Sequence, residues 1–213
     1  MADDSLSARK LVEAALPIFG LRGLEGASTR EIAKAADKPM SAITYHFGGK
    51  EGLYLACARH ISETMGQLLG LAGEAQTVTD AADARGKVGQ LMGLLVNAML
   101  RHETTPFVRF IVREQQEPTA AFDIIYGGGM GRALAWLCAL IGVIADGRIP
   151  DIEIRVRVVA LVGQVMGFRV ARAATLRLTG WSDLGEAERA VIDRVIQSHL
   201  GAILDQLGQE QQA

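Results

Sequence analysis

The sequence has few aromatic residues and no excess of positive charge, and each shortage excludes a class of protein. Aromatic residues make up 5% of the 213 positions, which disfavours single-strand nucleic-acid binders that stack bases on aromatic rings. Lysine and arginine number 22 against 24 aspartates and glutamates, so the formal net charge is −2. A chain that coats nucleic acid by bulk positive charge is therefore excluded, and any phosphate contact must come from a local patch.

Cysteines and long apolar runs are also scarce. The two cysteines, Cys57 and Cys138, lie far apart in apolar stretches, and we expect them to be buried free thiols of a cytoplasmic protein. The longest apolar run, Ala133–Ala145, has about thirteen residues, fewer than the roughly 18 that a membrane span requires. The acidic start Met1-Ala2-Asp3-Asp4 lacks the apolar segment of a secretion signal. The sequence predicts no membrane partner.

Apolar residues, 49% of the chain, recur mostly every three or four positions, the spacing of amphipathic helices. The stretch Ile152–Val158 alternates apolar and charged residues as a strand does, but its length without a turn residue favours a helix. Residues 70–86 are small and polar and predict a loop. The expected helices are 7–21, 29–36, 41–47, 50–71, 87–100, 106–116, 118–145 with an interruption at 127–129, 150–174, and a last one after Ser182.

Two short helices joined by a tight turn stand out near the start of the chain. Ser28 and Glu31 have the spacing of a capping box that begins the first helix, and Asp37-Lys38-Pro39 ends it. A short helix, Ser41–Phe47, follows at once, with Ile43 facing inward. Two helices separated by three or four residues are typical of a helix-turn-helix.

The candidate DNA-contacting residues lie at the starts of these helices and of the next one. They are Thr29, Arg30, Ser41, Ala42, Thr44, Tyr45, His46 and Lys50. Small hydroxyl and methyl groups suit base edges and thymine methyls, whereas the tyrosine, histidine and lysine suit phosphate oxygens. The amides and dipole of a helix start also attract a phosphate. A helical hairpin with ordinary exposed polar residues explains these residue types about equally well.

The same residues carry a resemblance to a known family. Residues 9 to about 60 resemble the DNA-binding domain of TetR-family transcriptional regulators. The matching pieces are Leu11-Val12-Glu13-Ala14-Ala15, Phe19, Gly23, Thr29-Arg30-Glu31-Ile32-Ala33, Ala36, Ile43-Thr44-Tyr45-His46-Phe47 and Lys50-Glu51-Gly52-Leu53. The family turn usually carries Gly and Val where this chain has Asp37 and Lys38, and residues 39–41 also depart from the commonest pattern. Farther on, Arg113–Pro118 and Ala121–Asp123 resemble the C-terminal domain of CecR-type regulators.

The resemblance implies an all-α fold with two domains. Residues 5–60 would form a three-helix DNA-binding domain, with the helix-turn-helix at 28–47, and residues 61–213 a helical bundle for ligand binding and dimerisation. Its partners would be double-stranded operator DNA, a small and largely apolar effector, and a second copy bound through the last two helices. We expect a repressor that an inducer releases from a palindromic operator. Residues 5–60 contain eight basic and five acidic residues, so the expected DNA-binding domain is weakly basic.

Candidate effector-binding residues are apolar and adaptable, although residues of this kind are more often plain core. They are Met92, Met99, Phe107, Phe110, Met130, Trp136, Met166 and Phe168. Arg109, Arg113 and Glu114 would supply polar contacts if they faced inward, although we expect them at the surface. No cofactor and no metal are expected, since the histidines and cysteines lack the spacing of metal ligands.

Two alternative functions stay open at this point. One is a helical adaptor that binds a protein and not DNA. The other is a dinucleotide-dependent enzyme, because Phe122–Tyr126 followed by Gly127–Gly131 looks like a strand leading into a phosphate-binding loop. Arg132 stands where the third glycine of that motif belongs, so we do not expect an enzyme.

Overall fold

The computed structural model describes residues 2–68 and 77–209, and these ranges contain helices and turns but no strand. The predicted all-α class is confirmed. Within the chain, two compact units form: residues 1–67 with 103–131, and residues 68–102 with 132–213. The first unit therefore takes in a segment, 103–131, that the sequence analysis assigned to the C-terminal domain.

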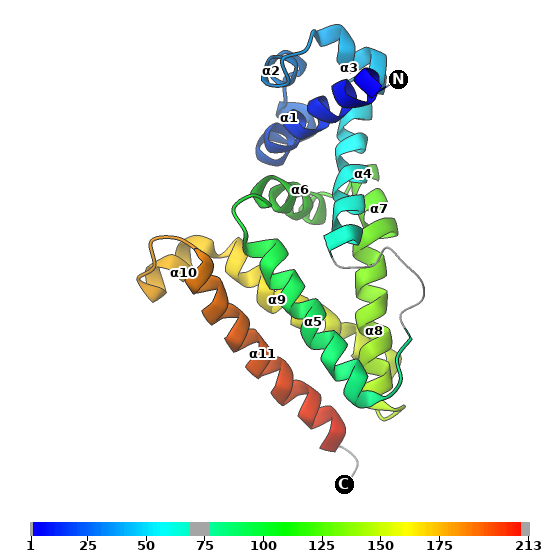
Figure 1. Cartoon of the computed structure of the whole chain (residues 1–213), viewed down its shortest axis with the longest axis vertical. Coiled ribbons are helices and arrows are strands. Elements are labelled where there is room, and N and C mark those ends of the chain that lie inside the picture. Colours follow the sequence, from blue (N-terminus) through cyan, green and yellow to red (C-terminus); the bar gives the residue numbers. More distant parts are fainter. Residues whose placement is uncertain (1, 69–76, 210–213) are drawn as a thin grey trace. The chain divides into compact units, whose positions relative to one another are not determined.

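The first unit consists of the helices in residues 1–67 and in residues 103–131 (Figure 1). Its elements are α1 (Ala2–Gly26), α2 (Thr29–Ala35), α3 (Met40–Phe47), α4 (Lys50–Leu68), α6 (Thr105–Gln116), α7 (Ala120–Ile125) and the π-helical turn η1 (Tyr126–Met130). Helix α1 packs along α6 as well as against α2 and α3. The core of the first unit includes Leu11, Phe19, Ile43, Leu53 and Phe110, each no more than 1% exposed.

The expected first helix, 7–21, is longer in the structure because the run extends from Ala2 to Gly26. Gly23, at φ 70° and ψ −177°, marks a break in that run, and only glycine adopts this conformation readily. Its missing side chain leaves room for the Arg113 guanidinium, since a Cβ there would stand 2.7 Å from Nη1. Glycine thus allows α6 to approach the end of α1.

The expected interruption at 127–129 is present as a kink between two helices. Helices α7 and α8 (Gly131–Ala145) are joined through η1, in which Gly128 has φ −108° and ψ −119°. The Gly129 amide donates a 2.8 Å hydrogen bond to Ser62 Oγ of α4, and a Cβ on Gly129 would overlap the Ser62 carbonyl oxygen. The glycines thus let two backbones meet. The alternative of a strand and dinucleotide loop is wrong, because helix α7 occupies the strand's place.

The helical run Ala120–Ala145 is long and apolar enough to cross a membrane, with a mean hydropathy of 1.6. It is longer than the thirteen-residue apolar run in the sequence because it also includes α7 and η1. About 33% of its most apolar window is buried within the protein. Core helices of soluble proteins pass the same test of length and composition, so this helix by itself is weak evidence for a span.

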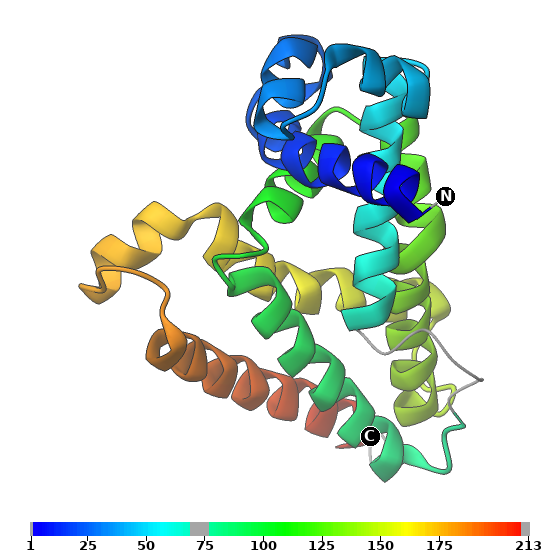
Figure 2. The same ribbon diagram turned by 45° about the horizontal axis from the view of Figure 1, so that its top comes forward.

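The second unit consists of α5 (Ala81–Leu100), α8, α9 (Asp151–Val170), α10 (Arg172–Thr179) and α11 (Glu186–Gln209). Helix α5 packs against both α9 and α11, and the three can be followed side by side in Figures 1 and 2. One face of α11 buries Ile192, Ile196, Leu200, Leu204 and Leu207. The choice of helix over strand at 152–158 is confirmed by α9.

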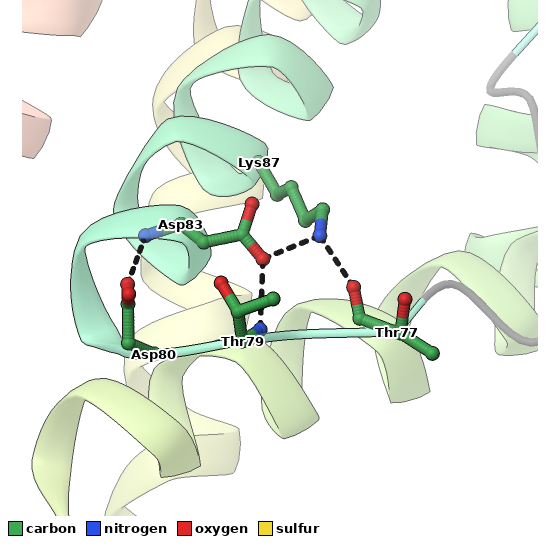
Figure 3. A network of polar contacts seen from close by, with 5 residues as sticks. All are labelled: Thr77, Thr79, Asp80, Asp83 and Lys87. Carbon is green, nitrogen blue, oxygen red and sulfur yellow. Dashed lines mark hydrogen bonds and ion pairs between the residues drawn. The ribbon is translucent and has the colours of Figure 1, made fainter.

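The predicted loop 70–86 is too long at its end, because α5 begins at Ala81 and includes Gly86; residues 69–76 lie outside the described part. Asp80 caps the helix by accepting from the Asp83 amide at 2.8 Å. The Asp83 carboxylate in turn accepts from Lys87 at 2.6 Å and from the Thr79 amide at 3.0 Å (Figure 3). These bonds, that of Lys87 first, lower the pKa of Asp83.

Candidate nucleic-acid interface

Helices α2 and α3 pack against each other across a short turn, as a helix-turn-helix requires. Ile32 and Ala33 of α2 and Ile43 of α3 are buried at 2% exposure or less. The small alanine allows the second helix to approach closely. Because α3 is buried on the side of Ile43, its opposite face is exposed.

Asp37 occupies the position of the turn where the family usually has glycine. Its φ is 53°, in the left-handed region that aspartate tolerates better than most residues. The Asp37 amide donates to the Lys34 carbonyl at 3.2 Å, and the Lys38 amide donates to the Ala33 carbonyl at 2.9 Å. The turn is therefore closed by backbone bonds with aspartate in place of glycine. Pro39, at φ −66° and ψ 148°, then leads into α3.

The capping box predicted from Ser28 and Glu31 is wrong. Ser28 is the N-cap of α2, but its side chain makes no capping hydrogen bond. Glu31 Oε2 instead pairs with Arg22 Nη1 of α1 at 2.5 Å. A charged partner nine positions earlier in the chain competes for the carboxylate, because charge-assisted bonds are stronger than neutral ones.

The exposed face of α3 carries most of the predicted contact residues. Ser41 and Thr44 are exposed, Ala42 is half-buried, and Tyr45 is 76% exposed. Met40, which was not among the predicted contact residues, is 48% exposed at the first position of the helix. The helix was expected to begin one residue later, at Ser41, so Met40 fell outside it.

His46 lies differently from its neighbours. Its side chain is 10% exposed, and its Nδ1 stands 3.6 Å from Oδ1 of Asp4 in α1. The Tyr45 ring meets it edge-on, with centroids 4.9 Å apart. The histidine thus contacts the first turns of α1 and supports the ring of Tyr45, so the structure gives it little surface from which to reach a phosphate.

Lys50, at the start of α4, has protein partners of its own. Its Nζ donates to the carbonyl oxygens of Glu25 and Ala27 at 3.3 and 3.4 Å. Lysine side chains commonly bind the unpaired carbonyls at a helix end. Two of its three N–H groups are used in this way, which leaves one for a phosphate. At the start of α2, Arg30 is exposed and Thr29 half-buried.

A buried polar cluster connects α4 with α6 and α7. Glu114, expected at the surface, is 1% exposed. Its Oε1 accepts from the Tyr54 hydroxyl at 2.6 Å, and its Oε2 accepts from the Thr119 amide at 3.0 Å and the Thr119 hydroxyl at 2.8 Å. Three donors therefore depend on one carboxyl group. Sequence spacing does not reveal this cluster, because Tyr54 lies 60 positions before Glu114.

Burial, and then the bond to Glu114, raise the pKa of Tyr54 above its ordinary 10.0. The neutral phenol is thus favoured more in the folded than in the unfolded chain. The resulting stabilisation is complete below pH 10 and is lost as the pH rises toward the higher value of the folded state. The phenol also packs edge-on against Phe19, with centroids 4.9 Å apart.

The candidate effector-binding residues are divided between the two units. Phe107, Phe110 and Met130 lie in the core of the first unit or pack against it. The ring centroids of Phe110 and Tyr54 are 4.5 Å apart. In the second unit, Met92 and Met99 are buried and three more are half-buried: Trp136, Met166 and Phe168. Among the described residues, no group of three or more His, Cys, Asp or Glu is placed to hold a metal ion.

Comparison with known families divides the chain into two consecutive parts, the second of which includes residues 103–131 of the first unit. Residues 11–57 match the family described as bacterial regulatory proteins, tetR family. Residues 84–207 match the C-terminal domain of the HTH-type transcriptional dual regulator CecR. The chain is 32% identical over 207 residues to CecR from Shigella flexneri, and the match covers 94% of this chain and 92% of that protein.

Solved structures show the same fold at low sequence identity. The structure of AibR in complex with isovaleryl coenzyme A and operator DNA is 15% identical, with a TM-score of 0.69, and the match covers 91% of this chain and 97% of AibR. A TetR-family transcriptional regulator from Mesorhizobium loti is 18% identical, with a TM-score of 0.60 and coverage of 95% and 96%.

The helix-turn-helix and the full-length similarity define this protein as a DNA-binding transcriptional regulator and not an enzyme. It belongs to the TetR family, and its C-terminal domain is of the CecR type. Regulators of this family are soluble DNA-binding proteins.

Proposed function

We propose that the protein is a homodimeric, ligand-responsive repressor of the cytoplasm that binds a palindromic operator. Residues 5–60 form the DNA-binding domain, and each protomer places α3 in a major groove. The observation that carries this proposal is the exposed polar face of α3, held on a buried core by Ile43. The distance between the two copies of α3 in the dimer would match a multiple of the roughly 34 Å helical turn of DNA.

An exposed apolar surface on α9 and α11, here called the α9/α11 stripe, supports the dimer. Its members are small or apolar and share the exposed sides of the two helices. They are Ile152, Val156, Val159, Ala160, Gly163, Gly167 and Val170 of α9 and Val191 and Val195 of α11. On the same helices, exposed His199 Nδ1 lies 3.1 Å from Gln164 Oε1. A face this apolar is typical of an isologous interface with a second copy.

The effector we propose is a small, largely apolar molecule bound in the C-terminal domain, residues 61–213. The Trp136 indole Nε1 is buried without a hydrogen-bond partner among the described residues, and buried polar groups usually have one. A polar atom of the effector would satisfy this donor. To release the operator, the effector must bind the DNA-incompetent state more tightly than the competent one.

A second candidate is a regulator that both activates and represses. The observation in its favour is that the CecR relative is described as a dual regulator. Reporter transcription from the protein's own upstream promoter, with and without the gene, separates the two. Loss of the gene raises transcription if the protein represses and lowers it where the protein activates.

Replacing Arg30 by Ala tests the proposed DNA interface. We expect the slope of log affinity against log salt to fall by about one for each protomer, because one phosphate contact is lost. The measurement is fluorescence anisotropy with the upstream intergenic DNA over a series of salt concentrations. Arg59→Ala is the matched control, since Arg59 is exposed on α4 outside the motif and its loss removes the same charge.

An unchanged slope in Arg30→Ala contradicts the phosphate contact. If the wild-type dimer shifts no DNA at low salt, the adaptor alternative replaces the repressor. Sequence-selective, salt-dependent binding by the wild-type protein supports the repressor.

A further inference from the structure

Helix α3 contains none of the residues that read bases by paired hydrogen bonds. Its sequence, MSAITYHF, has no Arg, Lys, Asn or Gln. Arg and Lys are the usual readers of guanine, and Asn and Gln those of adenine. The ring of His46 is mostly buried and faces Asp4, so it adds no reader to the exposed face. Helix α3 therefore has to recognise base pairs by another kind of contact.

Apolar and hydroxyl groups remain on that face. Met40 is 48% exposed, and Thr44, one turn later, is exposed on the same side, as the spacing of four residues requires. Each offers a methyl group. Ala42, half-buried on α3, offers a third. In the major groove, the thymine C5-methyl is the base feature that apolar contacts recognise.

Met40 is the most favourably placed of these residues. It is the first residue of α3, directly after Pro39, whose fixed backbone sets the start of the helix. In helix-turn-helix proteins, N-terminal residues of the second helix contact the base edges. A methionine side chain is long and flexible, so it reaches farther into the groove than the short side chains beside it.

We infer that α3 reads its half-site through thymine methyl groups and that Met40 is the principal specificity-determining residue. This inference rests on the proposed placement of α3 in the major groove. It predicts that the preferred half-site has thymine at the position that faces Met40. Paired hydrogen bonds to guanine or adenine would then come from outside α3, with exposed Arg30 of α2 as the available guanidinium.

Removing the thymine methyl tests the inference without changing base pairing. The full-length protein first selects its preferred sequence from a library of randomised DNA duplexes. That duplex is then made with 2′-deoxyuridine in place of thymidine, one position at a time. We expect wild-type binding to weaken about fivefold or more at the thymine facing Met40, the lower end of the effect of a changed base pair.

The Met40 variants connect that loss to one side chain. In Met40→Ala the affinity for the thymine duplex falls, and the deoxyuridine penalty shrinks to less than about twofold, because the contact is already gone. Met40→Leu retains an apolar contact and keeps most of the penalty. Leu21→Ala is the control, since Leu21 is 60% exposed on α1, and it keeps the full penalty. Circular dichroism checks that each variant is folded.

The possible results separate the inference from the function on which it rests. Selective binding that is indifferent to deoxyuridine at every position overturns methyl reading. A full penalty in Met40→Ala overturns the assignment to Met40. If no sequence is enriched from the library by the folded protein, the proposed operator binding fails, and the inference fails with it.

Discussion

Replacing Glu114 by Ala is expected to lower the free energy of unfolding of the first unit by about 3 kcal/mol, with a fall in Tm of about 15 °C. The change leaves the buried Tyr54 hydroxyl without its acceptor, which costs about 1–3 kcal/mol. It also removes the acceptor of the Thr119 amide and hydroxyl, whose bonds are only part-buried, so that water replaces part of their loss. The labelling of Cys57 during heating measures the effect, because this thiol is fully buried and its pKa is raised by burial.

The experiment is made in a Cys138→Ser background, so that only the thiol of the first unit reacts. Glu117→Ala is the matched control, because Glu117 is exposed at the end of α6, and its Tm should change by less than about 2 °C. Glu114→Gln should show an intermediate loss, since an amide nitrogen cannot accept from these donors. A Tm for Glu114→Ala that equals the control's contradicts the role of the cluster.

Replacing Val159 by Glu is expected to weaken dimerisation about 1,000-fold and to abolish tight operator binding. Val159 is 67% exposed in the single chain, so the second unit tolerates the charge. In a symmetric interface the carboxylate is buried twice, and an unpaired buried charge costs several kcal/mol. Sedimentation velocity measures the oligomeric state, and anisotropy with the operator measures binding.

Val143→Glu is the control for that experiment. Val143 is 42% exposed on α8, in the same unit but outside the α9/α11 stripe, so its variant should stay dimeric. A Val159→Glu protein that dimerises as well as this control places the interface elsewhere.

The regular parts of the fold could be predicted because local spacing determines them. The apolar positions of 152–158 fit a helix, and α9 is one. The short α2 and α3 follow from Ile32, Ala33 and Ile43, which form the inner side of the motif. A periodicity of three and four residues is sufficient to predict a helix wherever burial of one apolar face is the main source of its stability.

Side chains with distant partners could not be predicted in this way. The capping box failed because Arg22 pairs with Glu31. Glu114 is buried because Tyr54, sixty positions earlier, meets it. The glycines at 127–129 indicated the interruption that the structure has at Gly128, but not the close approach to Ser62 that it makes possible. In each case the deciding partner belongs to another element, and sequence spacing contains no information about that partner.

The way the chain passes between the two compact units bears on how this regulator can be rearranged. The chain leaves the first unit after residue 67, returns at 103, and leaves again after 131. A fragment that ends at residue 67 would strip Phe110 and Glu114 from Tyr54. A hybrid regulator made by exchanging DNA-binding domains should therefore receive residues 103–131 as well as residues 1–67, as two separate segments.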